Sequence, residues 1–168
     1  MDSAMADWSP LRGSARFLWN GVLPERRDIR RQVSLPRHTR AIADLHAAFQ
    51  STGGIANSNE MTVRLRAHYD QPISQLARWI VARDVVSYTD CSETFLPLFQ
   101  FELAQMSPRQ DVRTVIAELV SVFDDLELAW WFAESNAWLS GSTPVDSLRG
   151  DPGAVLNAAR ADRFVANG

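Results

Sequence analysis

The chain contains no lysine, so each of its 17 fixed positive charges is carried by an arginine. It contains a single cysteine, Cys91, which excludes an intrachain disulfide and a metal site built from several cysteines. This cysteine usage suits a reducing compartment, and we expect a cytoplasmic protein. No apolar run approaches the ~20 residues that span a bilayer, and the N-terminal segment lacks the continuous apolar stretch of a secretory signal. We therefore expect no membrane partner.

Enzyme signatures are also lacking. The sequence has no P-loop, no Gly-rich dinucleotide turn and no His pair at metal-binding spacing. The three histidines, His38, His46 and His68, do not share a helix face, and Cys91 lies in a predicted turn without a base nearby in sequence. The acidic residues at 124–127 suit the cap and first turn of a helix better than paired acid–base catalysis. We therefore expect no catalytic residue, no metal site and no cofactor.

The charges that are present are unevenly distributed. Residues 1–83 hold 12 arginines against 7 acidic residues, a net charge of +5, whereas residues 84–168 hold 5 arginines against 13 acidic residues, a net charge of −8. The planar guanidinium suits bidentate contacts with phosphates and guanine edges. Two surfaces with different partners are one interpretation. A genome rich in G and C would also favour arginine over lysine, so charge alone does not decide for nucleic acid.

The length of 168 residues and the hydrophobic content of 46% suit one compact unit or two small lobes that share a core. Residues 1–38, with scattered Pro, Gly and Ser, predict a poorly ordered basic arm. Four arginines in "PERRDIRRQ", residues 24–32, could contact phosphates. The alternative for this segment is a solvated tail or a short helix.

Capping residues and helical periodicity predict three helices in the next part of the chain. They cover residues 39–50, 58–69 and 74–83, and open on Thr39, Ser58 and Ser74. Two β-rich runs flank "TDCSE" and predict a hairpin over residues 85–101. Pro97 should place the second strand at a sheet edge or end it early.

The strongest helix signal covers residues 107–123, where Ser107 and Gln110 form a capping-box pattern and Pro108 takes the first helical position. Its apolar stripe should face the core: Val112, Val115, Ile116, Leu119 and Phe123. Helix 126–134 is apolar nearly all round and should be central. Two short helices should follow, each after a capping residue and a proline: 144–149 after Thr143 and 152–164 after Asp151.

These elements predict a mainly α protein with one β-hairpin. A winged helix-turn-helix-like lobe, residues 39–106, should pack on a C-terminal helical lobe, residues 107–168. Phe99 and Phe101 should share one strand face and join the two lobes.

In a winged helix-turn-helix the second helix enters the major groove and the wing contacts the backbone. The candidate DNA-binding residues are therefore Gln75 and Arg78 for bases, and Arg64, Arg66 and Arg83 for phosphates. The alternative is a helix–hairpin packing unit that binds no nucleic acid. It is supported by Asp70 and Asp84, which partly cancel the arginines, and by the apolar character of helix 74–83.

The C-terminal third, "VIAELVSVFDDLELAWWFAESNAWLSGSTPVDSLRGDPGAVLNAARADRF", resembles the toxin-binding domain of Xre/MbcA/ParS-type antitoxins. The resemblance covers about residues 108–164 and depends on an aromatic-rich "WF" helix end, the pattern "N.WL.G..P.D.L" and a final "AVL.AAR" helix. The combination is fairly specific, whereas each residue alone is weak. The preceding "GG…LARWI…VVSY…LPLFQFE" is also similar to the middle segment of related proteins.

The resemblance implies a non-enzymatic antitoxin that dimerises, blocks an NAD-consuming toxin of the RES fold and represses its own operon. It implies a structural role for five residues, Trp138, Leu139, Pro144, Asp146 and Leu148, and a surface for the toxin formed by Arg160, Arg163 and Phe164. The chain lacks a recognisable Xre-type DNA-binding domain, however. A stand-alone DNA-binding transcription regulator, or an interaction module that uses the domain to dimerise, therefore stays open.

Residues 136–148, "NAWLSGSTPVDSL", predict a hinge between helices, with Gly141 permitting the turn and Thr143-Pro144 starting the next helix. Trp138 and Leu139 should fold back under this turn. On that interpretation Trp138→Ala would lower stability by roughly 3–5 kcal/mol, as expected for a buried tryptophan.

Overall fold

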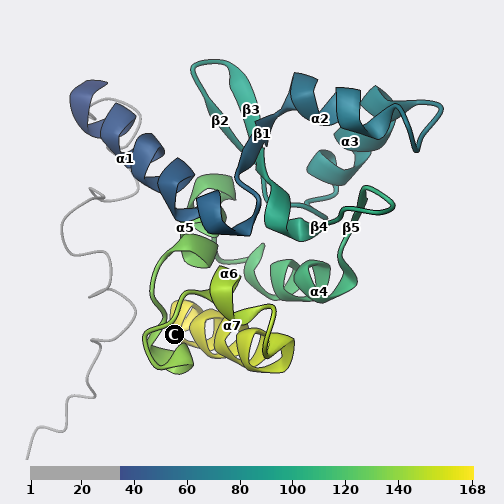
Figure 1. Cartoon of the computed structure of the whole chain (residues 1–168). Coiled ribbons are helices and arrows are strands. Elements are labelled where there is room, and N and C mark those ends of the chain that lie inside the picture. The colour runs from purple at the N-terminus through teal and green to yellow at the C-terminus, as the bar shows by residue number, and fades with distance from the viewer. Residues whose placement is uncertain (1–34) are drawn as a thin grey trace, which may run out of the picture. The chain divides into compact units, whose positions relative to one another are not determined.

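The computed structural model describes residues 35–168, with side chains described from His38 on. The basic arm predicted over residues 1–38 lies outside the described residues, apart from its last four. The described part is mainly helical, as predicted, with small antiparallel sheets (Figure 1). None of its helices has the length and apolar character needed to cross a membrane.

The first half of the described chain alternates helices and short strands. These are α1 (Leu35–Ala48), η1 (Gln50–Thr52, a 3-10 helix), β1 (Ile55–Asn57), α2 (Ser58–Leu65), α3 (Pro72–Val81), β2 (Tyr88–Asp90), β3 (Glu93–Pro97) and η2 (Leu98–Gln100). The second half contains β4 (Phe101–Glu102), β5 (Ser107–Pro108), α4 (Gln110–Leu119), α5 (Asp125–Ala133), η3 (Ala137–Leu139), α6 (Pro144–Ser147) and α7 (Pro152–Asn167).

Two of the three helices predicted in the first half start earlier than expected, and the third starts at Ser58 as predicted but has a different cap. Helix α1 already begins at Leu35, so Thr39 does not cap it. Helix α2 is capped by Asn57, whose side chain accepts from the Glu60 backbone at 2.9 Å, while Glu60 reaches back to the Asn57 backbone at 3.0 Å. This capping box satisfies two free N–H groups at once. Helix α3 opens at Pro72, which has no N–H to satisfy, so Ser74 lies inside the first turn.

The predicted hairpin is confirmed as β2 and β3, joined by Cys91 and Ser92. Both turn residues have positive φ, 46° and 70°, as a two-residue turn that follows the strand twist requires. Strand β3 does end at Pro97, but it is not an edge strand, because the order in the sheet is β1-β3-β2. Strand β1 was not predicted, because three residues are too few to show an alternating apolar pattern.

The helix predicted over residues 107–123 starts later and ends earlier than expected. Ser107 and Pro108 form strand β5, which pairs with β4, and Arg109 takes the N-cap position of α4. The predicted capping box of Ser107 and Gln110 is therefore wrong, because the backbone of Ser107 is held in a ladder. The apolar stripe is confirmed: Val112, Val115, Ile116 and Leu119 are buried, and half-buried Phe123 packs beside them. Helices α5, α6 and α7 start at the predicted caps, Asp124, Thr143 and Asp151.

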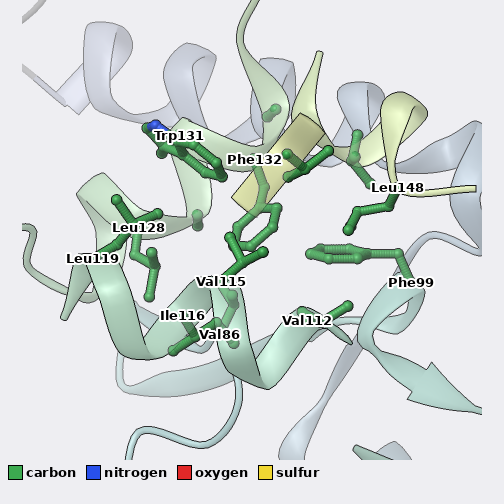
Figure 2. Packing of buried hydrophobic residues seen from close by; sticks show 14 of the residues in the cluster. Val86, Phe99, Val112, Val115, Ile116, Leu119, Leu128, Trp131, Phe132 and Leu148 are labelled. Atoms are coloured by element: carbon green, nitrogen blue, oxygen red, sulfur yellow. The ribbon is translucent and has the colours of Figure 1, made fainter. Parts of the chain in front are cut away.

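The buried apolar residues form two clusters. The larger, which we call the C-terminal core, joins α1 with α4, α5, α6 and α7, and Figure 2 shows Phe132 among its members. Its centre includes Phe49, Leu119, Leu128 and Phe132, each at most 1% exposed. The smaller, which we call the α2–α3 core, is formed by residues of α2, α3 and the segments around β1, β3 and β4, and it includes Met61, Leu65 and Trp79.

Phe99 and Phe101 do not share a strand face, contrary to the prediction. Residues 98–100 form the 3-10 helix η2, so Phe99 packs in the C-terminal core and Phe101 in the α2–α3 core. Between them Gln100 is 1% exposed, and its side-chain amide accepts from the Val86 N–H at 2.6 Å and donates to the Val86 and Pro97 carbonyls at 2.8 and 2.9 Å. A polar side chain thus joins the two clusters and satisfies backbone groups that would otherwise be buried without partners.

Candidate protein-binding and DNA-binding surfaces

The carboxylate of Asp162, on α7, receives three hydrogen bonds from the segment before it. The Trp131 indole N–H and the Asn136 amide donate to Oδ2, both at 2.8 Å, and the Trp138 indole N–H donates to Oδ1 at 3.0 Å. Asn136 also accepts from the Trp138 backbone N–H at 2.8 Å, which sets the direction of η3. Two residues of the motif "N.WL.G", Asn136 and Trp138, therefore position the last helix through a carboxylate that lies 26 and 24 residues further along the chain.

The five residues expected to organise this domain divide into two groups. Leu139, Pro144 and Leu148 are buried, as a structural role requires. Asp146 is exposed, and its carboxylate accepts a hydrogen bond from the Thr143 hydroxyl at 2.7 Å, so it supports the cap of α6.

Trp138 does not fold back under the turn. Its side chain is 60% exposed, held at one edge by Asp162, and the prediction that it is buried was wrong. The hinge itself matches expectation, since Gly141 has φ +84°. Trp138 and Leu139 are successive residues of the 3-10 helix η3, where neighbouring side chains point about 120° apart, so Leu139 enters the core while the Trp138 ring does not. The sequence pattern could not separate these two neighbours, because both are large and apolar.

The residues expected to face a toxin lie near the end of α7. Arg160 binds Glu118 of α4 through Nε at 2.9 Å, and Arg163 pairs with the other oxygen of the same carboxylate. Helices α4 and α7 lie against each other (Figure 1), and Glu118 is only 16% exposed between them. Phe164 is 79% exposed. The two arginines thus have a structural partner already, whereas Phe164 contributes almost nothing to the core.

The candidate DNA-binding residues are also in different environments. Arg64, Arg66 and Arg78 are exposed, and no ion pair to any of them is found within residues 38–168. Gln75 is half-buried on α3. The exposed surface of α3 also carries Ile73, at 70% exposure, and Val81, at 84%.

Arg83 is engaged inside the fold. Its guanidinium donates to the Val120 carbonyl at 2.7 Å and to the Phe123 carbonyl at 2.9 Å, and it pairs with Asp125 at 2.9 Å. These contacts join the end of α3 to the segment between α4 and α5. Arg83 also has φ 53°, a left-handed conformation that favours glycine. The structure therefore gives this arginine a structural role.

Two titratable groups have perturbed pKa values. Burial raises the pKa of the Tyr88 hydroxyl, and the neighbouring Asp90 carboxylate raises it further. Burial also raises the pKa of Glu134, which ends α5. His46 lies against Tyr88 and Phe95, with ring centroids 6.2 and 5.3 Å apart. Within the described part of the chain, no three His, Cys, Asp or Glu side chains are grouped so that they could hold a metal ion.

Comparison of the chain with protein-family models, with curated proteins and with solved structures returns no match.

Proposed function

We propose that the chain is a non-enzymatic, antitoxin-like cytoplasmic protein that binds and neutralises an NAD-consuming toxin of the RES fold, and that it acts as a homodimer. The observation that carries this proposal is the pair of exposed aromatic side chains near the end of α7. Phe164 is 79% exposed and Trp138 is 60% exposed. Large aromatic side chains that are exposed on well-ordered elements often contribute much of the binding energy of protein interfaces.

The support beneath these aromatics is rigid. Asp162 fixes the Trp138 ring through its indole N–H, and Glu118 ties α7 to α4 through Arg160 and Arg163. Little conformational entropy would therefore be lost when a partner covers this end of the helix. The two arginines stand beside Phe164 in the sequence and would form the polar rim of such an interface.

The test uses the toxin encoded by the gene next to that of this chain, produced with and without it. The toxin alone should deplete cellular NAD and the pair should not, and the two proteins should co-purify. Phe164→Ser should weaken the complex at least about tenfold if Phe164 is a hot spot of the interface, because truncation of a hot-spot residue costs about 2 kcal/mol or more. Val63→Ser is the matched control, since Val63 is a comparably exposed apolar residue on α2, at 60%.

Trp138→Ala separates binding from stability. At 60% exposure the ring should contribute less than about 1.5 kcal/mol to folding, well below the cost of removing a buried tryptophan. We expect a small change in melting temperature together with weaker toxin binding. If no neighbouring gene encodes an NAD-consuming protein, or if both aromatic variants protect cells as well as the original chain, the proposal fails.

A second candidate function is binding to operator DNA through a winged helix-turn-helix. The supporting observation is the order α1–β1–α2–α3–β2–β3 with β1 beside β3, which gives two helices followed by a wing-like hairpin. Three exposed arginines, Arg64, Arg66 and Arg78, have no acidic partner within the described residues and could neutralise phosphates. The exposed Ile73 and Val81 on α3 favour instead a protein contact.

DNA from the region upstream of the gene provides the test for this second function. Fluorescence anisotropy should show binding that weakens steeply with salt, and each of Arg64→Gln, Arg66→Gln and Arg78→Gln should reduce the salt slope by about one if that arginine meets a phosphate. Binding that survives all three changes would rule out this surface. A chain that dimerises but binds neither toxin nor DNA would be an interaction module.

A further inference from the structure

A cavity of about 400 Å³ lies where η1, α2, β4 and α6 meet. This volume falls within the range of small-molecule sites. Part of its wall is apolar and belongs to the folded core, because Leu98, Phe99 and Leu148 are each less than 10% exposed. Figure 2 shows Phe99 and Leu148 near each other in the C-terminal core. The shape of this wall is therefore fixed before any ligand arrives.

Arginines from three separate parts of the chain line the same cavity: Arg64 of α2, Arg109 before α4, and Arg149 after α6. Arg109 is paired with Asp111. Arg64 and Arg149 have no ion pair and no side-chain hydrogen bond within the described residues. Glu102 is the one acidic residue of the lining, and no ion pair joins it to these arginines. The two unpaired arginines, Arg64 and Arg149, thus outnumber the single carboxylate of the lining, which favours an anionic ligand.

A second hollow, of about 630 Å³, adjoins the first and shares Glu102, Arg109 and Arg149 with it. The rest of its lining is mainly polar: it includes Gln105, Ser107 and Gln110, and also Asp111, whose carboxylate is paired with Arg109. Arg149 therefore stands at the boundary between an apolar-walled cavity and a polar one. This arrangement matches a ligand whose apolar part enters the first hollow while its acidic group stays at the boundary.

We propose that this cavity binds a small organic anion, whose apolar body packs against Leu98 and Phe99 and whose oxyanion head is held by Arg149 and Arg64. Guanidinium groups recognise carboxylate and phosphate alike through paired hydrogen bonds. Burial of the apolar body against the preformed wall supplies the rest of the affinity. The inference is independent of toxin binding. Because Arg64 also belongs to the candidate DNA surface, Arg149 carries the main test.

Isothermal titration calorimetry of the full chain with four compounds measures the separate contributions of the ligand's acidic head and its apolar body. The compounds 1-naphthyl phosphate and 1-naphthoate share an apolar body and differ in their acidic head. Inorganic phosphate has the head alone, and 1-naphthol the body alone. At least one naphthyl anion should bind saturably and at least about tenfold more tightly than either partial probe, because only it uses both features of the cavity. The preferred head distinguishes a phosphate ligand from a carboxylate ligand.

The variants that test the site are on the surface, so the fold should persist, and circular dichroism checks this. Arg149→Gln should weaken binding of the naphthyl anion about tenfold, by removal of a charge-assisted contact. Leu103→Ser, at a lining residue that is 68% exposed, should weaken the naphthyl anion and leave inorganic phosphate unchanged. Arg66→Gln is the matched control, since Arg66 is an exposed arginine that directly follows α2 and does not line the cavity.

Three results would overturn the proposal. The first is the absence of saturable binding for both naphthyl anions. The second is equal affinity for the naphthyl anion in the Arg149→Gln and Arg66→Gln chains. The third is self-association of the chain that Arg149→Gln abolishes, which would make a second copy the occupant of the cavity.

Discussion

Replacement of Arg83 tests most directly how the two apolar clusters are held together. The guanidinium donates to the carbonyls of Val120 and Phe123, which end α4 and the segment after it. Hydrogen bonds from a charged group contribute about 1.5–3 kcal/mol each. The side chain is 31% exposed, which places the pair near the low end of that range. We therefore expect Arg83→Ala to lower the free energy of unfolding by about 3 kcal/mol.

Arg83→Gly adds an internal check on this reasoning. Arg83 has φ 53°, and the left-handed conformation costs about 1 kcal/mol or more for a residue with a Cβ atom. The Asp84 N–H bonds to the Trp79 carbonyl at 2.9 Å and the Arg83 N–H to the Ile80 carbonyl at 3.0 Å, a helix ending that normally uses glycine. Glycine removes that strain, so Arg83→Gly should be more stable than Arg83→Ala by about 1 kcal/mol even though both lose the guanidinium.

The assay is thermal unfolding followed by circular dichroism. For a protein of this size 1 kcal/mol corresponds to about 2–4 °C in Tm, so Arg83→Ala should melt roughly 6–12 °C below the original chain. Arg78→Ala is the control, because Arg78 is an exposed arginine of α3, the helix that Arg83 follows, and its replacement should change stability by less than about 0.5 kcal/mol. The reasoning is refuted if Arg83→Ala has the same Tm as the control Arg78→Ala. If Arg83→Ala instead keeps its stability and loses DNA affinity, the hypothesis that Arg83 contacts a phosphate regains support.

Three further substitutions have expected outcomes. Asp162→Ala removes the acceptor of three hydrogen bonds and should destabilise by about 2–4 kcal/mol in urea unfolding, whereas a loss below 1 kcal/mol would mean that α7 docks without it. Gln100→Leu leaves the buried Val86 N–H and carbonyl unpaired and should lower the free energy of unfolding by about 3 kcal/mol, and an unchanged urea midpoint would show that water replaces the amide. For Glu134 the folded-state pKa is raised by burial, so the folded state holds its proton more tightly than the unfolded state, and stability decreases as pH rises from about 4.5 through the folded pKa. Glu134→Gln should flatten that decrease and raise stability at pH 7, while an identical pH profile in both chains would contradict it.

Much of the secondary structure could be predicted from the sequence because local signals there agree with packing. The caps at Asp124, Thr143 and Asp151 each supply an oxygen that the first turn needs, and the structure uses all three. The predicted cap at Ser107 failed for the opposite reason. Ser107 lies in strand β5, which pairs with β4, so it is not available to cap a helix. A capping pattern covers only a few neighbouring residues and contains no information about a strand partner.

The candidate surfaces were harder to predict than the elements. The sequence does not reveal whether an arginine binds a phosphate or a distant part of its own chain. Arg83, for example, donates to the carbonyl of Phe123, which lies 40 residues away. Trp138 and Leu139 are adjacent and both large and apolar, yet their side chains leave the 3-10 helix η3 in different directions and only Leu139 is buried. The acceptor that positions Trp138 is Asp162, on a helix that the sequence links to it only through spacing.

The arginines that have no acidic partner are the ones best placed to bind a ligand or another molecule. Arg83, Arg109, Arg113, Arg160 and Arg163 are each bound to an acidic side chain, so their charge is already used within the fold. Arg149 is different, because it borders an apolar-walled cavity without an acidic partner among the described residues. An unpaired cation beside a preformed apolar wall gives a ligand both an electrostatic and a hydrophobic contribution, whereas an unpaired cation on an open helix face gives only the first. Arg149 is therefore the arginine whose replacement should separate ligand binding most cleanly from stability.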